Sequence, residues 1–221
     1  MAQAPRSTGS SLDLSEDPIE NATAWFRANQ KPTLYVLGAV LVTSAAIYLY
    51  RATNANTREK ASAALYQAEA PLAAGKLAEA QAALQKVATR YASTSAGQQA
   101  ALLLAQVFFD QKQYDAGIKS LETAAGGASR DFAASMEGLI AMGYDAKGDF
   151  GKAAEHFAKA SGLAKFALDK GQYRASQARS LMSGNKLDDA RKIWEDLALD
   201  EGMAVAQEAK VRLGEIAGSA K

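Results

Sequence analysis

His156 is the only histidine in the chain and the side chain best suited to acid–base chemistry near neutral pH. It lies between Glu155 and Phe157, in a segment that favours a helix. Acid–base catalysis would also need a nucleophile or a second acid close to the imidazole, and the sequence marks no such partner. We therefore expect His156 to have a structural or surface role.

Two short motifs resemble pieces of catalytic sites. Residues 183–186 (SGNK) fit a Ser-x-x-Lys pattern, and residues 148–152 (GDFGK) resemble part of a phosphate-binding loop. The second motif lacks the full glycine spacing, a Ser or Thr after the lysine and a preceding strand. Because both motifs fall where a turn between helices is expected, we interpret them as turns. The acidic pairs at 188–189 and 195–196 are expected to be solvated helix faces.

Composition excludes several classes of function. The 221 residues include 25 Lys and Arg against 24 Asp and Glu, so no polybasic surface for nucleic acid is indicated. Cysteine is absent, which excludes disulfides and Cys-based zinc sites, and one histidine leaves few ligands for a transition metal. A cysteine-free chain fits an oxidising or a reducing compartment equally well. We expect no enzyme, no cofactor, no metal site, no nucleic-acid partner and no small-molecule substrate.

The elements that position these residues belong to a repeat. Four similar segments align on Leu77, Tyr114, Phe150 and Leu187, with spacings of 37, 36 and 37 residues. Small residues lie three positions later, large apolar residues seven positions later, and alanine nine positions earlier. These three columns are Ala80, Gly117, Ala153 and Ala190; Leu84, Leu121, Phe157 and Trp194; and Ala68, Ala105, Ala141 and Ala178. The joint pattern predicts two antiparallel helices per unit, in which small residues permit close approach and large ones fill the space between hairpins.

The aligned columns resemble those of the tetratricopeptide repeat family. The resemblance implies four helical hairpins, which we place at residues 51–202. Two departures are a period two or three residues longer than in that family and the absence of its proline after the second helix. A third is Pro71, which stands where the other units have Phe108, Tyr144 and Leu181. The first hairpin is therefore the least regular, and its first helix could continue from the preceding segment through Asn56 to Ala70.

A last amphipathic segment follows the hairpins within residues 203–221. Val205, Ala209, Leu213 and Ile216 fall on one stripe of a helix. This pattern predicts a helix that caps the array, followed by a short tail.

An uncharged segment of 18 residues begins at Thr33 and ends at Tyr50. As a helix it would span about 27 Å, close to the hydrocarbon thickness of a bilayer. A buried core helix and a cleaved signal peptide are the two alternatives. The long acidic N-terminal extension and the lack of an Ala-x-Ala site just after the segment favour an uncleaved anchor. The predicted fold is thus all-α: a single N-terminal transmembrane helix at 33–50, followed by a tetratricopeptide-like helical-hairpin solenoid.

Aromatic residues flank this segment where membrane interfaces are expected. The predicted interface anchors are Trp25, Phe26, Tyr35, Tyr48 and Tyr50. We assign residues 20–32 to an interfacial segment and residues 1–19, rich in Ser, Gly, Pro and acids, to a disordered tail. Basic residues are nearly balanced on the two sides, so the flanking charges do not decide the orientation.

The layout also resembles one specific family across about residues 20–125. A Trp-containing N-terminal segment, one anchor and a repeat that begins AALYQAEAPLAAGKLAEAQAALQKVATRYASTSAGQQAALLLAQ are similar to the ancillary subunit of the bacterial Sec translocon, which shares its repeat domain with periplasmic cell-division coordinators. The resemblance implies a protein of the bacterial inner membrane with a cytoplasmic N-terminus and periplasmic repeats. It further implies a scaffold near the translocon and periplasmic chaperones. An accessory structural subunit of a respiratory or photosynthetic complex is the alternative.

If the repeats bind a partner protein, the first helices of the hairpins should line the concave face. The repeat columns place nine residues there: Gln99, Gln106, Phe109, Ser135, Met142, Asp145, Gln172, Arg179 and Met182. Met and Phe offer adaptable apolar contact, and the polar side chains offer hydrogen bonds to a peptide. Ordinary packing between helices is the alternative role for several of them.

Overall fold

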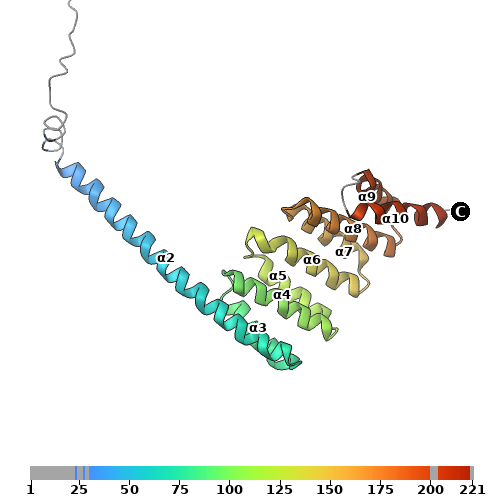
Figure 1. Ribbon diagram of the computed structural model, residues 1–221, viewed down its shortest axis with the longest axis horizontal. Helices are drawn as coiled ribbons and strands as arrows, with labels where there is room; N and C mark the ends of the chain where they lie inside the picture. Colours follow the sequence, from blue (N-terminus) through green and yellow to red (C-terminus); the bar gives the residue numbers. More distant parts are fainter. Residues whose placement is uncertain (1–22, 24–26, 28–29, 200–203, 220–221) are drawn as a thin grey trace, which may run out of the picture. The chain divides into compact units, whose positions relative to one another are not determined.

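The computed structural model describes residues 23, 27, 30–199 and 204–219, and within these residues every regular element is an α-helix (Figure 1). The chain divides into two compact units, Met1–Asn54 and Ala55–Lys221. The predicted interface residues Trp25 and Phe26 and the predicted disordered tail lie outside the described residues.

Helix α2 (Gln30–Ala73) begins in the first unit and ends in the second without a break. It is the one described helix that is long and apolar enough to cross a membrane, a test that a signal sequence also passes. No residue of its most apolar 18-residue window is buried in the structure. The hydroxyls of Thr43 and Thr53 donate to the carbonyls of Ala39 and Leu49 one turn earlier. These hydroxyls are therefore satisfied within the helix.

The second unit contains four helical hairpins and a terminal helix. The first helices of the hairpins are the C-terminal part of α2, α4 (Ser95–Asp110), α6 (Arg130–Ala146) and α8 (Ala167–Ser183). The second helices are α3 (Leu77–Arg90), α5 (Tyr114–Ala125), α7 (Phe150–Leu163) and α9 (Leu187–Leu199), and the terminal helix is α10 (Val205–Ser219). From α3 to α10 each helix packs against the next along the chain (Figure 1), which is the arrangement of a solenoid.

The sequence columns occupy the interfaces between these helices. All twelve residues of the three columns are buried, and Trp194 has no exposed surface. The four residues on which the repeats align are each the first residue of a second helix: Leu77, Tyr114, Phe150 and Leu187. The predicted all-α hairpin array is thereby confirmed, and its core is a succession of apolar clusters between neighbouring helices.

The turn inside each hairpin has the same length and geometry. It contains three residues in every unit, and its middle residue has a positive φ: Gly75 (71°), Lys112 (59°), Gly148 (79°) and Asn185 (57°). The next residue donates its N–H to a carbonyl five residues earlier, as in a Schellman motif. In the first unit this acceptor is Pro71, which receives the N–H of Lys76 at 2.9 Å. Because the turn uses only the carbonyl at this position, proline can stand there.

The connections between hairpins are more variable. The three that lie wholly within the described residues span 91–94, 126–129 and 164–166. In the first of them Thr94 caps α4 by accepting the N–H of Gly97 at 3.1 Å. A Cβ at Gly97 would lie 1.9 Å from the carbonyl oxygen of Tyr91, so only glycine fits this tight connection.

Gln98 ties two of these connections together. Its side chain is 4% exposed, and its Nε2 donates to the carbonyl of Ala92 at 3.4 Å. Its Oε1 accepts from the N–H and the hydroxyl of Ser129, at 3.0 and 2.9 Å. One buried amide therefore bridges the loop before α4 and the loop before α6, and this contact fixes two neighbouring hairpins against each other.

Helix α10 closes the C-terminal end of the array. Its residues Val205, Ala209 and Ile216 are buried in the cluster that contains Trp194, whereas Gln207 and Lys210 on its other side are exposed. The predicted apolar stripe thus packs onto the last hairpin, and a polar face is presented to solvent.

Candidate partner-binding surfaces

His156 lies on α7 and packs against α6, the other helix of the third hairpin. Its Nδ1 lies 2.7 Å from Oε2 of Glu137 on α6, and the two side chains are 14% and 19% exposed. Its ring stacks on that of Tyr144, with 5.3 Å between the centroids. The neighbours of the imidazole are thus a carboxylate and an aromatic ring that join α6 to α7, and the arrangement holds helices together.

Charged side chains extend this contact to neighbouring turns. The Nζ atoms of Lys152 and Lys147 lie 5.0 and 5.9 Å from the centre of the Tyr144 ring. A side-chain hydrogen bond to Asp115 raises the pKa of Lys147. The pKa of Asp149, which caps α7, is lowered because its carboxylate accepts the backbone N–H of Lys152. The SGNK and GDFGK motifs both lie at such turns, as expected.

Within the residues that the structure describes, no group of three or more His, Asp or Glu side chains could hold a metal ion. The acidic residues at 188–189 and 195–196 are exposed on α9. Asp196 pairs with Arg174 at 2.7 Å and Asp189 with Lys192 at 3.4 Å. Asp189 and Asp196 therefore act in surface ion pairs.

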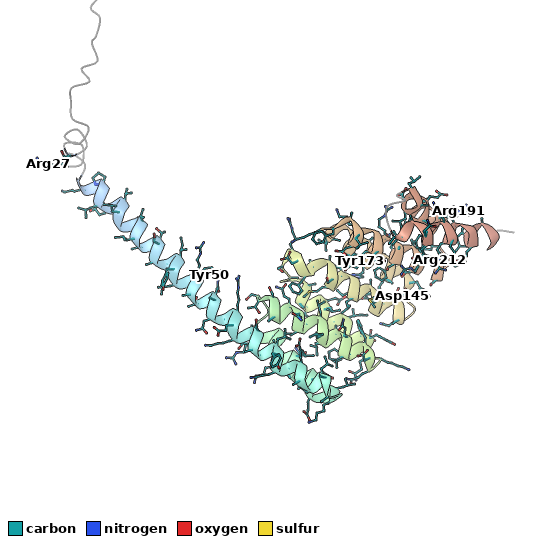
Figure 2. The ribbon with its side chains drawn as sticks, viewed as in Figure 1. Arg27, Tyr50, Asp145, Tyr173, Arg191 and Arg212 are labelled. Carbon is teal, nitrogen blue, oxygen red and sulfur yellow. The ribbon has the colours of Figure 1, made fainter. Side chains whose placement is uncertain are left out.

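The nine residues predicted for the first-helix face divide into two groups. Four of them are half-buried and contact a neighbouring helix. Phe109 packs against Gly117 and Gly143, Asp145 accepts the hydroxyl of Ser180 at 2.7 Å, Arg179 pairs with Glu208 at 2.9 Å, and Met182 accepts the indole N–H of Trp194 at 3.2 Å. Figure 2 shows Asp145 and Tyr173 in this part of the array. These four side chains take part in the packing that holds the hairpins together.

The other five predicted face residues are exposed: Gln99 and Gln106 on α4, Ser135 and Met142 on α6, and Gln172 on α8. Ser135 hydrogen-bonds the phenol of Tyr173, whose pKa is raised by burial. Met142 is 55% exposed, a large fraction for an apolar side chain. The predicted face thus keeps one exposed apolar side chain and three exposed amides, and its role in binding stays a prediction.

The predicted interface tyrosines are exposed on α2. Tyr35, Tyr48 and Tyr50 have 79%, 72% and 69% of their surfaces free, and Figure 2 shows Tyr50 projecting from the helix. Exposed tyrosines on an apolar helix suit the boundary between hydrocarbon and water.

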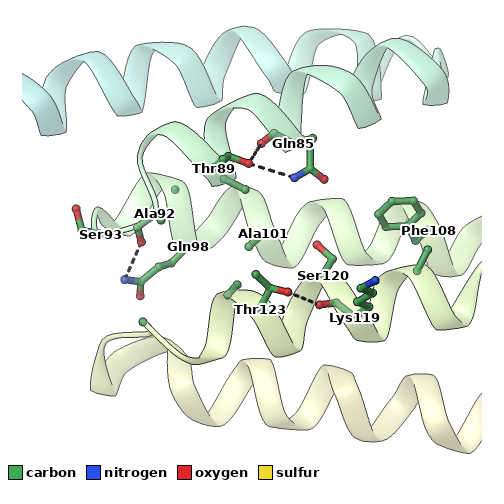
Figure 3. Close-up of a pocket in the computed structure, with 15 residues that line it drawn as sticks. Gln85, Thr89, Ala92, Ser93, Gln98, Ala101, Phe108, Lys119, Ser120 and Thr123 are labelled. Atoms are coloured by element: carbon green, nitrogen blue, oxygen red, sulfur yellow. Dashed lines mark hydrogen bonds between the residues drawn. The ribbon is translucent and has the colours of Figure 1, made fainter.

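A groove that the sequence did not predict lies between α3 and α5, the second helices of the first two hairpins (Figure 3). It has a volume of about 590 Å³, with α3 and α5 as its walls and α4 as its floor. Its lining combines small side chains with a few larger ones: Gln85, Ala88, Thr89, Ala92, Ser93, Gly97, Gln98, Ala101, Phe108, Ala116, Lys119, Ser120, Thr123, Ala124 and Gly127. No single residue of this set stands out in the sequence, so only comparison between repeats could have indicated the groove.

Comparison with solved structures supports the fold. Two similar structures are crystal structures of nearly identical TPR-like repeats of a Podosopora anserina putative kinesin light chain, one of them with a single substitution. Each superposes on this chain with a TM-score of 0.57 at 13% sequence identity. Each match covers 72% of this chain, and 85% or 86% of the other chain. At this identity the likeness concerns the fold alone. No curated protein matches the sequence significantly.

The family model of the tetratricopeptide repeat-like domain matches residues 23–209. This match includes α2 and all four hairpins, and it agrees with the hairpin geometry and the buried columns. The chain belongs to the tetratricopeptide repeat-like domain family.

Proposed function

We propose that the protein is a membrane-anchored, non-catalytic scaffold that binds partner proteins through its repeats. The observation that carries the proposal is the combination of a hairpin array with an apolar helix whose side chains are exposed. Repeats of this family generally mediate protein–protein contact, and an exposed apolar helix of this length is suited to a bilayer. Charged side chains of the array take part in ion pairs such as Arg174–Asp196 and Arg179–Glu208.

The finer proposal places the scaffold in the bacterial inner membrane, beside the Sec translocon and periplasmic chaperones. It rests on the sequence resemblance across about residues 20–125. In this arrangement the N-terminus is cytoplasmic, α2 crosses the bilayer and the repeats are periplasmic.

Labelling of single cysteines tests the orientation, because the natural chain has no cysteine. A membrane-impermeant maleimide should label the Glu195→Cys variant in intact spheroplasts. It should label a Ser7→Cys variant only after the inner membrane is permeabilised. The reverse pattern would refute a periplasmic repeat array, and the cysteine-free parent controls for background.

Co-purification tests the scaffold and its location. Gentle detergent extraction of the full chain should recover translocon subunits or chaperones in fixed proportion. The double variant Gln106→Glu/Met142→Glu changes two exposed positions and should retain the fold, so a partner lost with this variant binds the first-helix face. Recovery of a stoichiometric respiratory or photosynthetic complex without translocon subunits would contradict the proposed location. Recovery of no partner at all would contradict the scaffold itself.

A further inference from the structure

Equivalent spaces between second helices differ across the array. Each such space lies over the first helix between them, so the repeat alignment gives three comparable positions. On the floor helix, the residues of the next two repeats that align with Ala101 are Glu137 and Arg174. On the wall, the column of Ser120 continues as His156 and Ile193, and the column of Thr123 continues as Lys159 and Asp196.

In the second and third spaces, a long side chain on the floor pairs with a side chain on one wall. Glu137 meets His156 at 2.7 Å between α6 and α7, and Arg174 meets Asp196 at 2.7 Å between α8 and α9. In the first space the same positions carry Ala101 and the short side chains of Ser120 and Thr123. These shorter side chains line the groove of about 590 Å³.

The surface of this groove is suited to apolar side chains. Ala88, Ala101, Ala116 and Ala124 contribute only methyl groups, and Phe108 contributes a ring edge at one end (Figure 3). The hydroxyls of Thr89 and Thr123 donate to carbonyls of their own helices, at 2.8 and 2.9 Å. These donors are therefore satisfied without a ligand, and contact with apolar groups leaves them paired.

Lys119 is the one charged side chain among the residues that line the groove, and it is exposed on α5. A carboxylate on an incoming segment could pair with this ammonium at the rim, where such a pair contributes mainly to selectivity. Two parallel helical walls leave a channel of the kind in which amphipathic helices dock.

We propose that the groove between α3 and α5 is a docking site for an amphipathic helical segment of a partner protein. Large apolar side chains of that segment occupy the space above Ala101, and one of its carboxylates pairs with Lys119. This inference rests on the proposed function as a protein scaffold and names a binding surface on the second helices, separate from the first-helix face.

A groove-filling variant tests the site with a side-chain pair that the chain already contains. The double substitution Ala101→Glu/Ser120→His transfers the Glu137–His156 pair to the equivalent positions of the first space. Since the same pair is accommodated one repeat later, the variant should fold, and thermal melting followed by circular dichroism checks this. The matched control is Gln106→Glu/Met142→Glu on the first-helix face.

The probe is a phage-displayed library of random 12-residue peptides, selected on the full chain in lipid nanodiscs. Enriched peptides should carry apolar residues at helical spacing together with Asp or Glu. Fluorescence anisotropy with the enriched peptides should show a Kd at least ten times higher for the groove-filling variant and an unchanged Kd for the control. Lys119→Glu, an exposed change that leaves the core untouched, should raise the Kd of acidic peptides about threefold to fivefold, as expected for an exposed ion pair.

Several results would overturn the inference. They are a library that yields no binder, an equal Kd for the parent and the folded groove-filling variant, or loss of binding only in the first-helix control. If Ala101→Glu/Ser120→His fails to fold, an unchanged Kd for Lys119→Glu refutes the site. Partner recovery in the co-purification experiment combined with any of these results would leave the scaffold function standing and remove the groove alone.

Discussion

Lys112 occupies a position where the other hairpin turns have glycine or asparagine. Its φ of 59° lies in the left-handed region, as do those of Gly75, Gly148 and Asn185. A side chain other than Gly or Asn costs about 1–2 kcal/mol in this conformation. The Schellman hydrogen bond from Gln113 to Phe108 at 2.8 Å holds the turn in place against this cost.

Lys112→Gly should therefore stabilise the protein. We expect the free energy of unfolding to rise by about 0.5–1 kcal/mol, since relief of strain is partly offset by the greater freedom of glycine in the unfolded chain. Urea denaturation followed by circular dichroism measures the change. Lys76→Gly is the control, because Lys76 has a φ of −85° and gains nothing from glycine. An equal effect of both substitutions would contradict the strain argument.

The buried amide of Gln98 should contribute measurably to stability. Gln98→Leu keeps the approximate volume but removes the acceptor for the N–H and hydroxyl of Ser129. We expect a loss of about 1–3 kcal/mol in the free energy of unfolding, the usual cost of leaving a polar group unpaired. Gln99→Leu, next to it and exposed, should change stability by less than about 0.5 kcal/mol. Similar losses at both positions would argue against the bridge.

Asp149 should make the unfolding free energy of the protein depend on pH in the acidic range. Its pKa is lowered from 3.8 by the N–H of Lys152, so the ionised carboxylate is favoured in the folded state. A carboxyl group whose pKa is lowered by folding stabilises the protein above its unfolded pKa, and this contribution disappears as the pH falls through the folded pKa. Asp149→Asn keeps an acceptor at the helix cap but cannot be protonated in this range.

The difference in unfolding free energy between the parent and Asp149→Asn should therefore shrink as the pH falls from about 5 to about 2. Other carboxyl groups titrate equally in both proteins, so they cancel in the difference. Denaturation at several pH values provides the measurement. A difference that stays constant over this range would show that the cap does not titrate as described.

At the scale of elements, the sequence predicted the helices well because their order depends on local pattern. The residues on which the repeats align each begin a second helix, and the alanine column from Ala68 to Ala178 is buried throughout. The sequence also indicated that α2 could continue from the apolar segment into the first hairpin. Periodicity and turn residues contain this information within one repeat.

The division of the predicted face could not be predicted in the same way. Asp145 and Arg179 fall on the expected helices, but their partners are Ser180 and Glu208, far along the chain. A repeat alignment contains no three-dimensional distances, so it does not show which polar side chains bond to a neighbouring helix. The groove could not be predicted for a related reason, since its volume depends on how α3, α4 and α5 pack, although its short lining residues align with longer ones in later repeats.

Overpacking at the alanine column tests the hairpin interface directly. Ala141 has no exposed surface, so Ala141→Trp should force neighbouring side chains from their rotamers and cost on the order of 1–3 kcal/mol. Met142→Trp, at the adjacent exposed position, should have little effect. Thermal melting of both variants provides the measurement, and an unchanged melting curve for Ala141→Trp would refute the close packing.

At the scale of the whole molecule, α10 protects the last hairpin. Trp194 and Leu197 lie in one apolar cluster with Val205 and Ile216 of that helix. A chain that ends at Leu199 would expose this cluster, and an exposed apolar end of a repeat array promotes association.

We therefore expect the truncated chain to self-associate in detergent solution and the chain ending at Ser219 to behave as the parent does. Sedimentation velocity at several protein concentrations distinguishes the two. An identical sedimentation profile for both truncations would mean that α10 is dispensable as a cap.

The constant turns and variable connections of the array bear on how this protein can be engineered. Every turn within a hairpin has three residues with one left-handed position, so an added residue there would break the Schellman hydrogen bond. The connections between hairpins already differ in length and include exposed residues such as Gly126. A fluorescent reporter or affinity tag inserted next to Gly126 would leave the register of every helix intact, whereas the same insertion at residues 111–113 would shift a whole second helix out of its packing.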